Sequence, residues 1–213
     1  EAMNVVNERK RPYIVMEGMS DRFMATYKRP FEAKDIKVVM YAGGLHERYG
    51  LKKLTEAFMM LPQENFRLKL FGSGPFVEKL KTKYTKKDSR IQYMGVAPNA
   101  EVVAAELDAS LLVNPRPTHE EFTKYSFPSK NIEYMASGTP LLTTKLPGMP
   151  KEYYPYVFLI ENESVEGYAK ALESVLAQSD EELYVFGEKA KDFVLEKKNS
   201  FEQAKRVIEL IKL

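Results

Sequence analysis

The sequence contains no cysteine and no tryptophan, and only two histidines. Without cysteine, the chain cannot form disulfides, zinc ribbons, thiolate-bound iron-sulfur clusters or a thiol nucleophile, and its composition is consistent with the cytosol. The two histidines, His46 and His119, lie too far apart in sequence to form a local metal-binding pair. We therefore expect no metal centre built on cysteine or histidine.

Long apolar runs and an excess of one charge are also missing. No hydrophobic run approaches the ~20 residues that cross a bilayer, and the 32 basic side chains exceed the 30 acidic ones by only two. A dedicated nucleic-acid binder usually carries a concentrated basic excess, so we expect no nucleic-acid partner. The sequence predicts a cytoplasmic protein of one domain, or one domain and part of a second, and leaves peripheral membrane contact open.

From about residue 36 onward, short apolar runs alternate with amphipathic stretches. The runs predict strands, and the apolar spacing between them predicts helices, with three helices closing the chain. This rhythm predicts an α/β fold with a Rossmann-like, doubly wound parallel sheet. The predicted strands cover residues 36–41, 66–71, 91–94, 110–113, 141–144 and 157–160.

The last helices carry two kinds of signal. Ser179 with Glu182, and Ser200 with Gln203, have the spacing of capping boxes at helix starts. Two apolar stripes predict buried helix faces: Val165, Tyr168, Leu172 and Val175 in one helix, and Phe201, Ala204, Ile208 and Ile211 in the other.

The first residues do not follow the strand-helix rhythm. The chain begins at Glu1, and residues 1–30 combine a polar start with one apolar run and a basic stretch. We interpret residues 1–30 as a linker or the remnant of a preceding domain, and residues 31–213 as a ligand-binding domain.

In open parallel sheets, ligands collect at the carboxyl ends of the strands, where helix N-termini favour anions. Three loops in such positions stand out, residues 43–50, 72–75 and 114–129. The third loop is unusually long for a compact domain, which is typical of a functional loop. It carries Arg116 and leads into a helix that begins near Ser129 and Lys130.

These groups suit a diphosphate. Arg116 and Lys130 would each give it a charge-assisted hydrogen bond worth ~1.5 to 3 kcal/mol, and the helix terminus would add roughly 0.3 to 2 kcal/mol. Glu133 lies about one turn further along the helix, where its carboxylate could accept hydrogen bonds from a ribose diol.

Each feature also has a plainer explanation. The glycines of residues 43–44 and 72–75 suit tight turns between strand and helix, and neither pair forms a G-x-G-x-x-G motif. Arg116 and Lys130 could be solvated surface cations, and Glu133 an acid that favours the helix dipole.

The stretch of residues 127–140, FPSKNIEYMASGTP, resembles the motif of family-four (group 1) glycosyltransferases, which are retaining enzymes of the GT-B fold. The resemblance extends from about residue 36 to residue 213, and residues 15–21 resemble the hinge between the two domains of that family. It implies that this chain is the C-terminal, donor-binding half of a two-domain enzyme. The acceptor-binding half would then lie outside the chain.

The resemblance implies that Glu133 holds the ribose of a nucleotide-diphosphate sugar and that the helix beginning near Ser129 faces the diphosphate. Transfer to an acceptor hydroxyl, with retention, would then depend on stabilising the leaving diphosphate. The resemblance therefore implies that neither a metal nor a bound cofactor is required. We expect Glu133, Lys130 and Arg116 to be the catalytic residues. The residues expected to line the donor site are Gly43, Gly44, Gly74, Ser129, Asn131 and Glu133.

Three positions depart from the family pattern. Tyr125 stands where the family has the first glutamate of its motif, and Gly44 and Tyr49 stand where it usually has an arginine and a lysine. The departures imply a divergent branch of the kind associated with surface-polysaccharide assembly. Because the acceptor-binding half would lie outside the chain, we expect a glycan or lipid-linked acceptor to bind that missing domain, and the isolated chain to be inactive. Two alternatives remain at this point, a non-catalytic interaction module and an NAD-dependent oxidoreductase domain.

Overall fold

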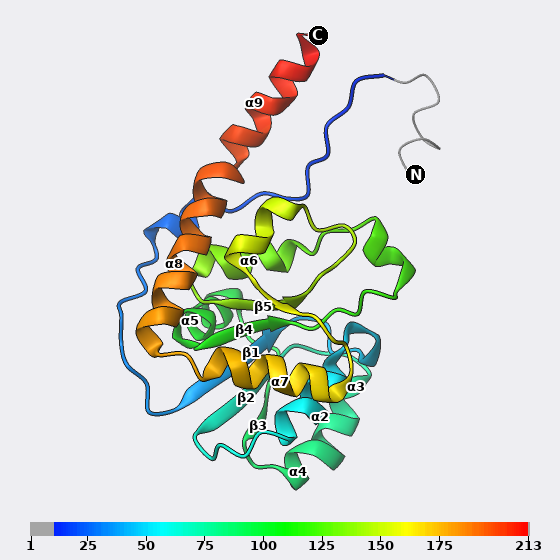
Figure 1. Cartoon of the computed structure of the whole chain (residues 1–213), viewed down its shortest axis with the longest axis vertical. Coiled ribbons are helices and arrows are strands. Elements are labelled where there is room, and N and C mark those ends of the chain that lie inside the picture. The colour runs from blue at the N-terminus through cyan, green and yellow to red at the C-terminus, as the bar shows by residue number, and fades with distance from the viewer. Residues whose placement is uncertain (1–10, 213) are drawn as a thin grey trace.

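The computed structural model describes residues 11–212, which form a single parallel sheet with helices on both faces (Figure 1). The strands are β1 (Lys37–Ala42), β2 (Phe66–Phe71), β3 (Ile91–Gly95), β4 (Leu111–Asn114), β5 (Leu141–Thr144) and β6 (Phe158–Ile160). The helices are α2 (Leu51–Met59), α3 (Phe76–Lys79), α4 (Thr85–Lys87), α5 (Asn99–Asp108), α6 (Ser129–Ser137), α7 (Val165–Leu176), α8 (Asp180–Lys197) and α9 (Ser200–Ile211).

The strand order is β3-β2-β1-β4-β5-β6, and every neighbouring pair is parallel. The chain builds the sheet outward from β1 to β3, returns through α5, and continues outward in the other direction from β4. The direction therefore reverses between β1 and β4, which makes this pair the topological switch point. The predicted Rossmann-like, doubly wound α/β fold is confirmed.

The central strand β1 shows why the sheet needs a helical layer on each face. Val39 and Tyr41 pack into the core beneath α2 and α7, whereas Val38 and Met40 pack into the core beneath α6 and α8. A strand with apolar side chains on both faces is stable only when both faces are covered, as parallel sheets require.

The predicted capping box of α8 is confirmed, because the Ser179 side chain accepts from the Glu182 amide and the Glu182 side chain accepts from the Ser179 amide. The prediction for the next helix was displaced by one residue. The N-cap of α9 is Asn199, whose side chain accepts from the Glu202 amide. Asparagine is as good an N-cap as serine, so the two neighbouring candidates could not be ranked from sequence.

The two predicted apolar stripes have different outcomes. Tyr168, Leu172 and Val175 of α7 are buried, as predicted. The stripe on α9 is wrong as a buried face, because Phe201 is 64% exposed and Ile211 is 77% exposed. In Figure 1, α9 extends away from the sheet, so most of its apolar face has no domain surface to pack against.

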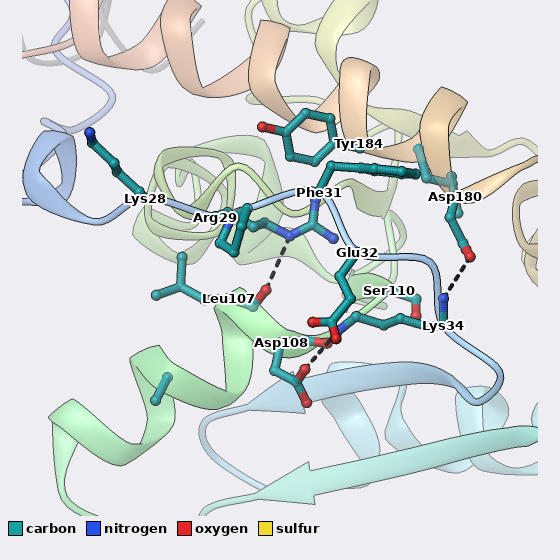
Figure 2. A pocket seen from close by; sticks show the side chains of 13 residues that line it. Lys28, Arg29, Phe31, Glu32, Lys34, Leu107, Asp108, Ser110, Asp180 and Tyr184 are labelled. Atoms are coloured by element: carbon teal, nitrogen blue, oxygen red, sulfur yellow. Dashed lines mark hydrogen bonds and ion pairs between the residues drawn. The ribbon is translucent and has the colours of Figure 1, made fainter.

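The segment before β1 is attached to the domain along much of its length. Met24 is buried in the core beneath α6 and α8, and the Ser20 amide donates to the Lys198 carbonyl over 2.7 Å. Arg29 donates to the carbonyls of Leu107 and Ala109, and Figure 2 shows the first of these contacts. The assignment of residues 1–30 to a linker stays a prediction, and residues 1–10 lie outside the described part.

Between residues 11 and 212, no helix combines the length and the apolar character needed to cross a bilayer.

Candidate functional site

The carboxyl ends of β1 and β2 approach each other closely because both strands lead into glycines. The Gly43 amide donates to the Phe71 carbonyl over 3.0 Å. A Cβ atom added at Gly72, where φ is +121°, would lie 2.9 Å from the carbonyl carbon of Gly43. Real Cβ atoms do not tolerate such an approach to backbone, so Gly72 brings the two loops together at the switch-point edge.

Helix α6 is fixed against the same edge by its own side chains. The Tyr134 hydroxyl accepts from the Ala42 amide over 2.8 Å and donates to the Ala42 carbonyl over 3.1 Å. Burial raises the pKa of Tyr134 well above its ordinary value, so its hydroxyl stays protonated and keeps both bonds. The N-terminus of α6, with its unpaired amides and positive dipole end, is thereby held beside the end of β1.

A cavity of about 180 Å³ lies at this edge, between the ends of β1 and β2 on one side and α5 and α6 on the others. Three of the predicted residues, Gly43, Lys130 and Glu133, line it together. The remaining lining residues come from the strand ends, the β3–α5 loop and α5: Ala42, Phe71, Gly72, Val96, Ala97, Asn99, Val102 and Glu106.

Lys130 lies across Gly43. A Cβ atom added at Gly43, where φ is +148°, would lie 2.6 Å from the Lys130 ammonium nitrogen. The side chain of Lys130 can therefore rest on the backbone only because position 43 has no side chain. A positive charge thus sits at the rim of the cavity, beside the N-terminus of α6 and one helical turn from the exposed Glu133.

Arg116 follows β4 and lies on the same carboxyl edge, outside the residues that line the cavity. Its guanidinium carbon is 5.2 Å from the ring centroid of Tyr49 and 5.2 Å from that of Phe122, and its Nε atom is buried without a hydrogen-bond partner among the described residues. Burial raises the pKa of Tyr41 to about 12, and the nearby Arg116 charge opposes that rise. Arg116 is therefore held in an aromatic setting close to Tyr41 and the glycine loop.

The structure corrects the prediction for Asn131. Its side chain is fully buried, and its Oδ1 atom accepts from Asn114 Nδ2 over 2.6 Å. It therefore joins α6 to β4 and is not among the residues that line the cavity. Position 131 faces the sheet because it lies one residue from Lys130, about 100° around the helix.

Other predicted positions lie beside the cavity without lining it. Ser129 is exposed in the first turn of α6. Gly44 accepts a hydrogen bond from the Tyr41 hydroxyl at its carbonyl, over 3.1 Å. Gly74 has a packing role, because a Cβ atom there would lie 2.8 Å from the carbonyl carbon of Leu45.

Sequence reasoning missed Glu106, which lines the cavity and is 1% exposed. Burial raises the pKa of its carboxyl group to about 8; Glu133 adds to this rise and Lys130 opposes it. The available signal was an acid in the last turn of α5, on the helix face that also carries Asn99 and Val102. That spacing indicates that the three residues share one face of the helix, but it does not indicate what that face contacts.

The long loop after β4 is held by Glu163, another residue that sequence reasoning missed. The Thr118 amide donates to Glu163 Oε2 over 3.1 Å, and the Thr118 hydroxyl also donates to this carboxylate. His119 stays 68% exposed beside it. Tyr125, at the position of the missing family glutamate, is 62% exposed.

A second cavity, of about 220 Å³, lies at the opposite, amino-terminal edge of the sheet (Figure 2). The segment before β1 lines it, and several of its polar groups bind one another. Lys34 forms an ion pair of 2.6 Å with Asp108, and the Lys34 amide donates to Asp180 over 2.9 Å. These contacts attach the segment to α5 and α8.

Comparison with known proteins agrees with this geometry. The family model described as "Glycosyl transferases group 1" matches residues 25–212. A protein of Escherichia coli K12 that is named as the colanic acid biosynthesis glycosyltransferase WcaL is 30% identical over 112 residues, which are 50% of this chain and 27% of that protein. The chain thus spans about a quarter of the length of this curated relative.

Solved structures share the fold. A mutant of S. aureus TarM, in complex with fondaparinux, α-GlcNAc-glycerol and UDP, matches with a TM-score of 0.74 and 16% identity, over 98% of this chain and 41% of TarM. The C-terminal domain of a group 1 glycosyl transferase of Francisella tularensis, LpcC, matches with a TM-score of 0.63 and 18% identity, over 78% of this chain and 87% of that domain. Because the family match covers most of the chain, this chain belongs to the group 1 glycosyltransferases and forms one Rossmann-like half of a GT-B fold.

Proposed function

We propose that the cavity at the β1/β4 edge binds a nucleotide-diphosphate sugar, from which a sugar is transferred, with retention, to an acceptor hydroxyl in the synthesis of a surface polysaccharide. The observation that carries this proposal is the convergence of Gly43, Lys130 and Glu133 on one cavity at the switch point. Crevices at this place in doubly wound sheets are where nucleotides bind.

Lys130, Glu133 and the cavity itself fit the three parts of the nucleotide. The Lys130 ammonium and the N-terminus of α6 offer positive charge to the diphosphate. Glu133, about one turn further along the helix, offers acceptor oxygens to the ribose hydroxyls. The cavity beyond them is left for the base.

Catalysis would depend on stabilising the leaving group. As the glycosidic bond lengthens, negative charge grows on the phosphate next to the sugar, and cations already fixed in place stabilise that charge. Lys130 would do this directly. Arg116 would do so from the neighbouring loop, where its guanidinium is held against Tyr49 and Phe122. The acceptor would be a glycan or a lipid-linked sugar bound by a domain outside this chain, so we expect the isolated chain to bind donor without turnover.

Binding of uridine and guanosine diphosphates, measured by thermal shift and calorimetry, tests the proposal. We expect Lys130→Ala to weaken the binding of nucleoside diphosphates by roughly tenfold or more, and that of monophosphates by less, because a charge-assisted hydrogen bond is worth ~1.5 to 3 kcal/mol. Lys189→Ala, which removes an exposed lysine from α8, is the matched control and should leave affinity unchanged.

Two results would contradict the proposal. If no nucleoside diphosphate stabilises the chain at millimolar concentration, while Lys130→Ala leaves the function of the full-length protein intact, the domain is a non-catalytic interaction module. The exposed Tyr125 at the position of a family glutamate is the observation that favours that second function. Stabilisation by NAD alone would instead indicate an oxidoreductase.

A further inference from the structure

Glu106 is a buried acid without an explanation in the fold. Its residue exposure is 1%, and neither carboxylate oxygen has a hydrogen-bond partner among residues 11–212. Its backbone carbonyl, by contrast, accepts from the Thr139 hydroxyl over 2.7 Å and from the Ala109 amide over 3.3 Å. Buried carboxyl groups without partners destabilise a protein, so one that persists inside a cavity points to a ligand.

The place of Glu106 in the cavity limits what that ligand can be. Asn99, Val102 and Glu106 follow one another along one face of α5, and this face forms one wall. The other walls are the glycine backbone at Gly43 and Gly72 and the α6 residues Lys130 and Glu133. A volume of about 180 Å³ is too small for a whole nucleotide sugar but suits one flat ring system, with the ribose and phosphates at the rim.

When it is ionised, the Glu106 carboxyl group has two unpartnered oxygens that call for two N–H donors side by side. A carboxylate accepts two parallel hydrogen bonds when the donors are spaced as in a guanidinium. Guanine offers this arrangement through its N1–H and its 2-amino group. Uracil offers one N–H between two carbonyl oxygens, which would repel a carboxylate, and adenine and cytosine each offer a single amino group beside a ring acceptor.

We propose that Glu106 is the base-recognition residue of the donor site and that it selects guanine, so that the donor is a guanosine-diphosphate sugar. The inference rests on the proposed function and adds the nucleobase to it. For the base to reach the carboxylate, the flexible Lys130 side chain moves from its place over Gly43 toward the diphosphate. Glu106 is a specificity residue and takes no part in the transfer step.

The test compares the affinities of guanosine, inosine and uridine diphosphates at pH 8.5, above the pKa of about 8 to which burial raises the Glu106 carboxyl group, so that this group is ionised. Inosine diphosphate lacks only the 2-amino group, so it removes one of the two donors. We expect the unaltered chain to bind guanosine diphosphate roughly tenfold or more tightly than either of the others, since each bond to a buried charge is worth about that much.

Glu106→Gln keeps the size of the side chain but replaces one acceptor oxygen by an NH₂ donor. We expect it to weaken the binding of guanosine diphosphate by roughly tenfold or more and to abolish the preference for guanosine over inosine diphosphate. The affinity for uridine diphosphate should change little. Glu101→Gln is the matched control, because Glu101 is exposed on the same helix.

The inference would be overturned if the unaltered chain bound uridine diphosphate as tightly as guanosine diphosphate or more tightly. It would also be overturned if Glu106→Gln lowered the affinity for all three diphosphates equally. The comparison of guanosine with inosine diphosphate needs no variant, so the inference stays falsifiable even if Glu106→Gln does not fold. Absence of binding by every nucleoside diphosphate would instead refute the proposed function.

Discussion

The carboxyl group of Glu106 makes stability depend on pH in an unusual direction. Its pKa is raised to about 8 in the folded protein, by burial first and then by Glu133, while Lys130 opposes the rise. Its ordinary pKa is near 4.5. The folded state therefore binds more protons than the unfolded state between these values, and stability falls as pH rises from about 5 to 8.

We expect Glu106→Gln to remove this loss. Relative to the unaltered chain, the variant should gain about 3 kcal/mol between pH 5.5 and pH 8.5, or roughly 6 to 12 °C in Tm. Thermal unfolding across that range measures the difference, with Glu101→Gln as the variant that should follow the unaltered chain. Parallel curves for Glu106→Gln and the unaltered chain would show that Glu106 is ionised to the same extent in both states.

Among the single residues around the cavity, sequence reasoning identified those whose positions follow from local spacing. Lys130 and Glu133 lie at positions i and i+3 at the start of a helix, so a single turn carries both to one cavity. Arg116 was placed on the correct edge, but its aromatic surroundings come from Tyr49 and Phe122 in two separate loops. Contacts between loops of this kind depend on tertiary packing, which no local pattern encodes.

Among the elements, α7 and α9 have similar apolar stripes and opposite environments. Leu172 of α7 is fully buried, whereas Ile208 of α9 is 53% exposed. The stripe predicts a helix and one apolar face in each case. Whether a surface is available to cover that face depends on the position of the helix in the fold, and α9 lies beyond the edge of the sheet.

We expect alanine substitutions in the two helices to differ in their effect on the free energy of unfolding. Leu172→Ala should lower the free energy of unfolding by about 2 to 5 kcal/mol, because it leaves a cavity between α7 and α2. Ile208→Ala should lower it by less than about 1 kcal/mol. Urea unfolding of both variants measures this, and similar losses would mean that the α9 face is covered in solution.

For the molecule as a whole, an ion pair holds the segment before β1 against the junction of α8 and α9. Lys198 binds Glu17, and both side chains are 5% exposed. Lys198 also binds Glu152 over 2.6 Å, and the Tyr153 hydroxyl donates to Glu17 over 3.0 Å. Burial alone would raise the pKa of Glu17, but the bonds from Lys198 and Tyr153 outweigh it and leave the pKa below its ordinary value.

The pH dependence of stability that Glu17 produces is therefore opposite to that of Glu106. The stabilisation from the Glu17 bonds is present above the ordinary pKa of Glu17 and is lost as pH falls through the lowered pKa. We expect Glu17→Gln to destabilise the chain by about 1 to 3 kcal/mol near pH 7 and to speed proteolysis between residues 11 and 30. Glu32→Gln, in the same segment but exposed, is the control; equal cleavage of both variants would show that the Glu17 bonds do not hold the segment.

The strand order has a further consequence for the bound state. The lining of the cavity comes from both halves of the sheet: Gly43, Gly72 and α5 belong to the first half, and α6 belongs to the second. A nucleotide held there would bridge the two halves of the sheet, which the β1–β4 pairing and the packing of α7 against α2 already join. Amide hydrogen exchange should consequently slow across both halves together when donor binds, including backbone that the nucleotide never touches.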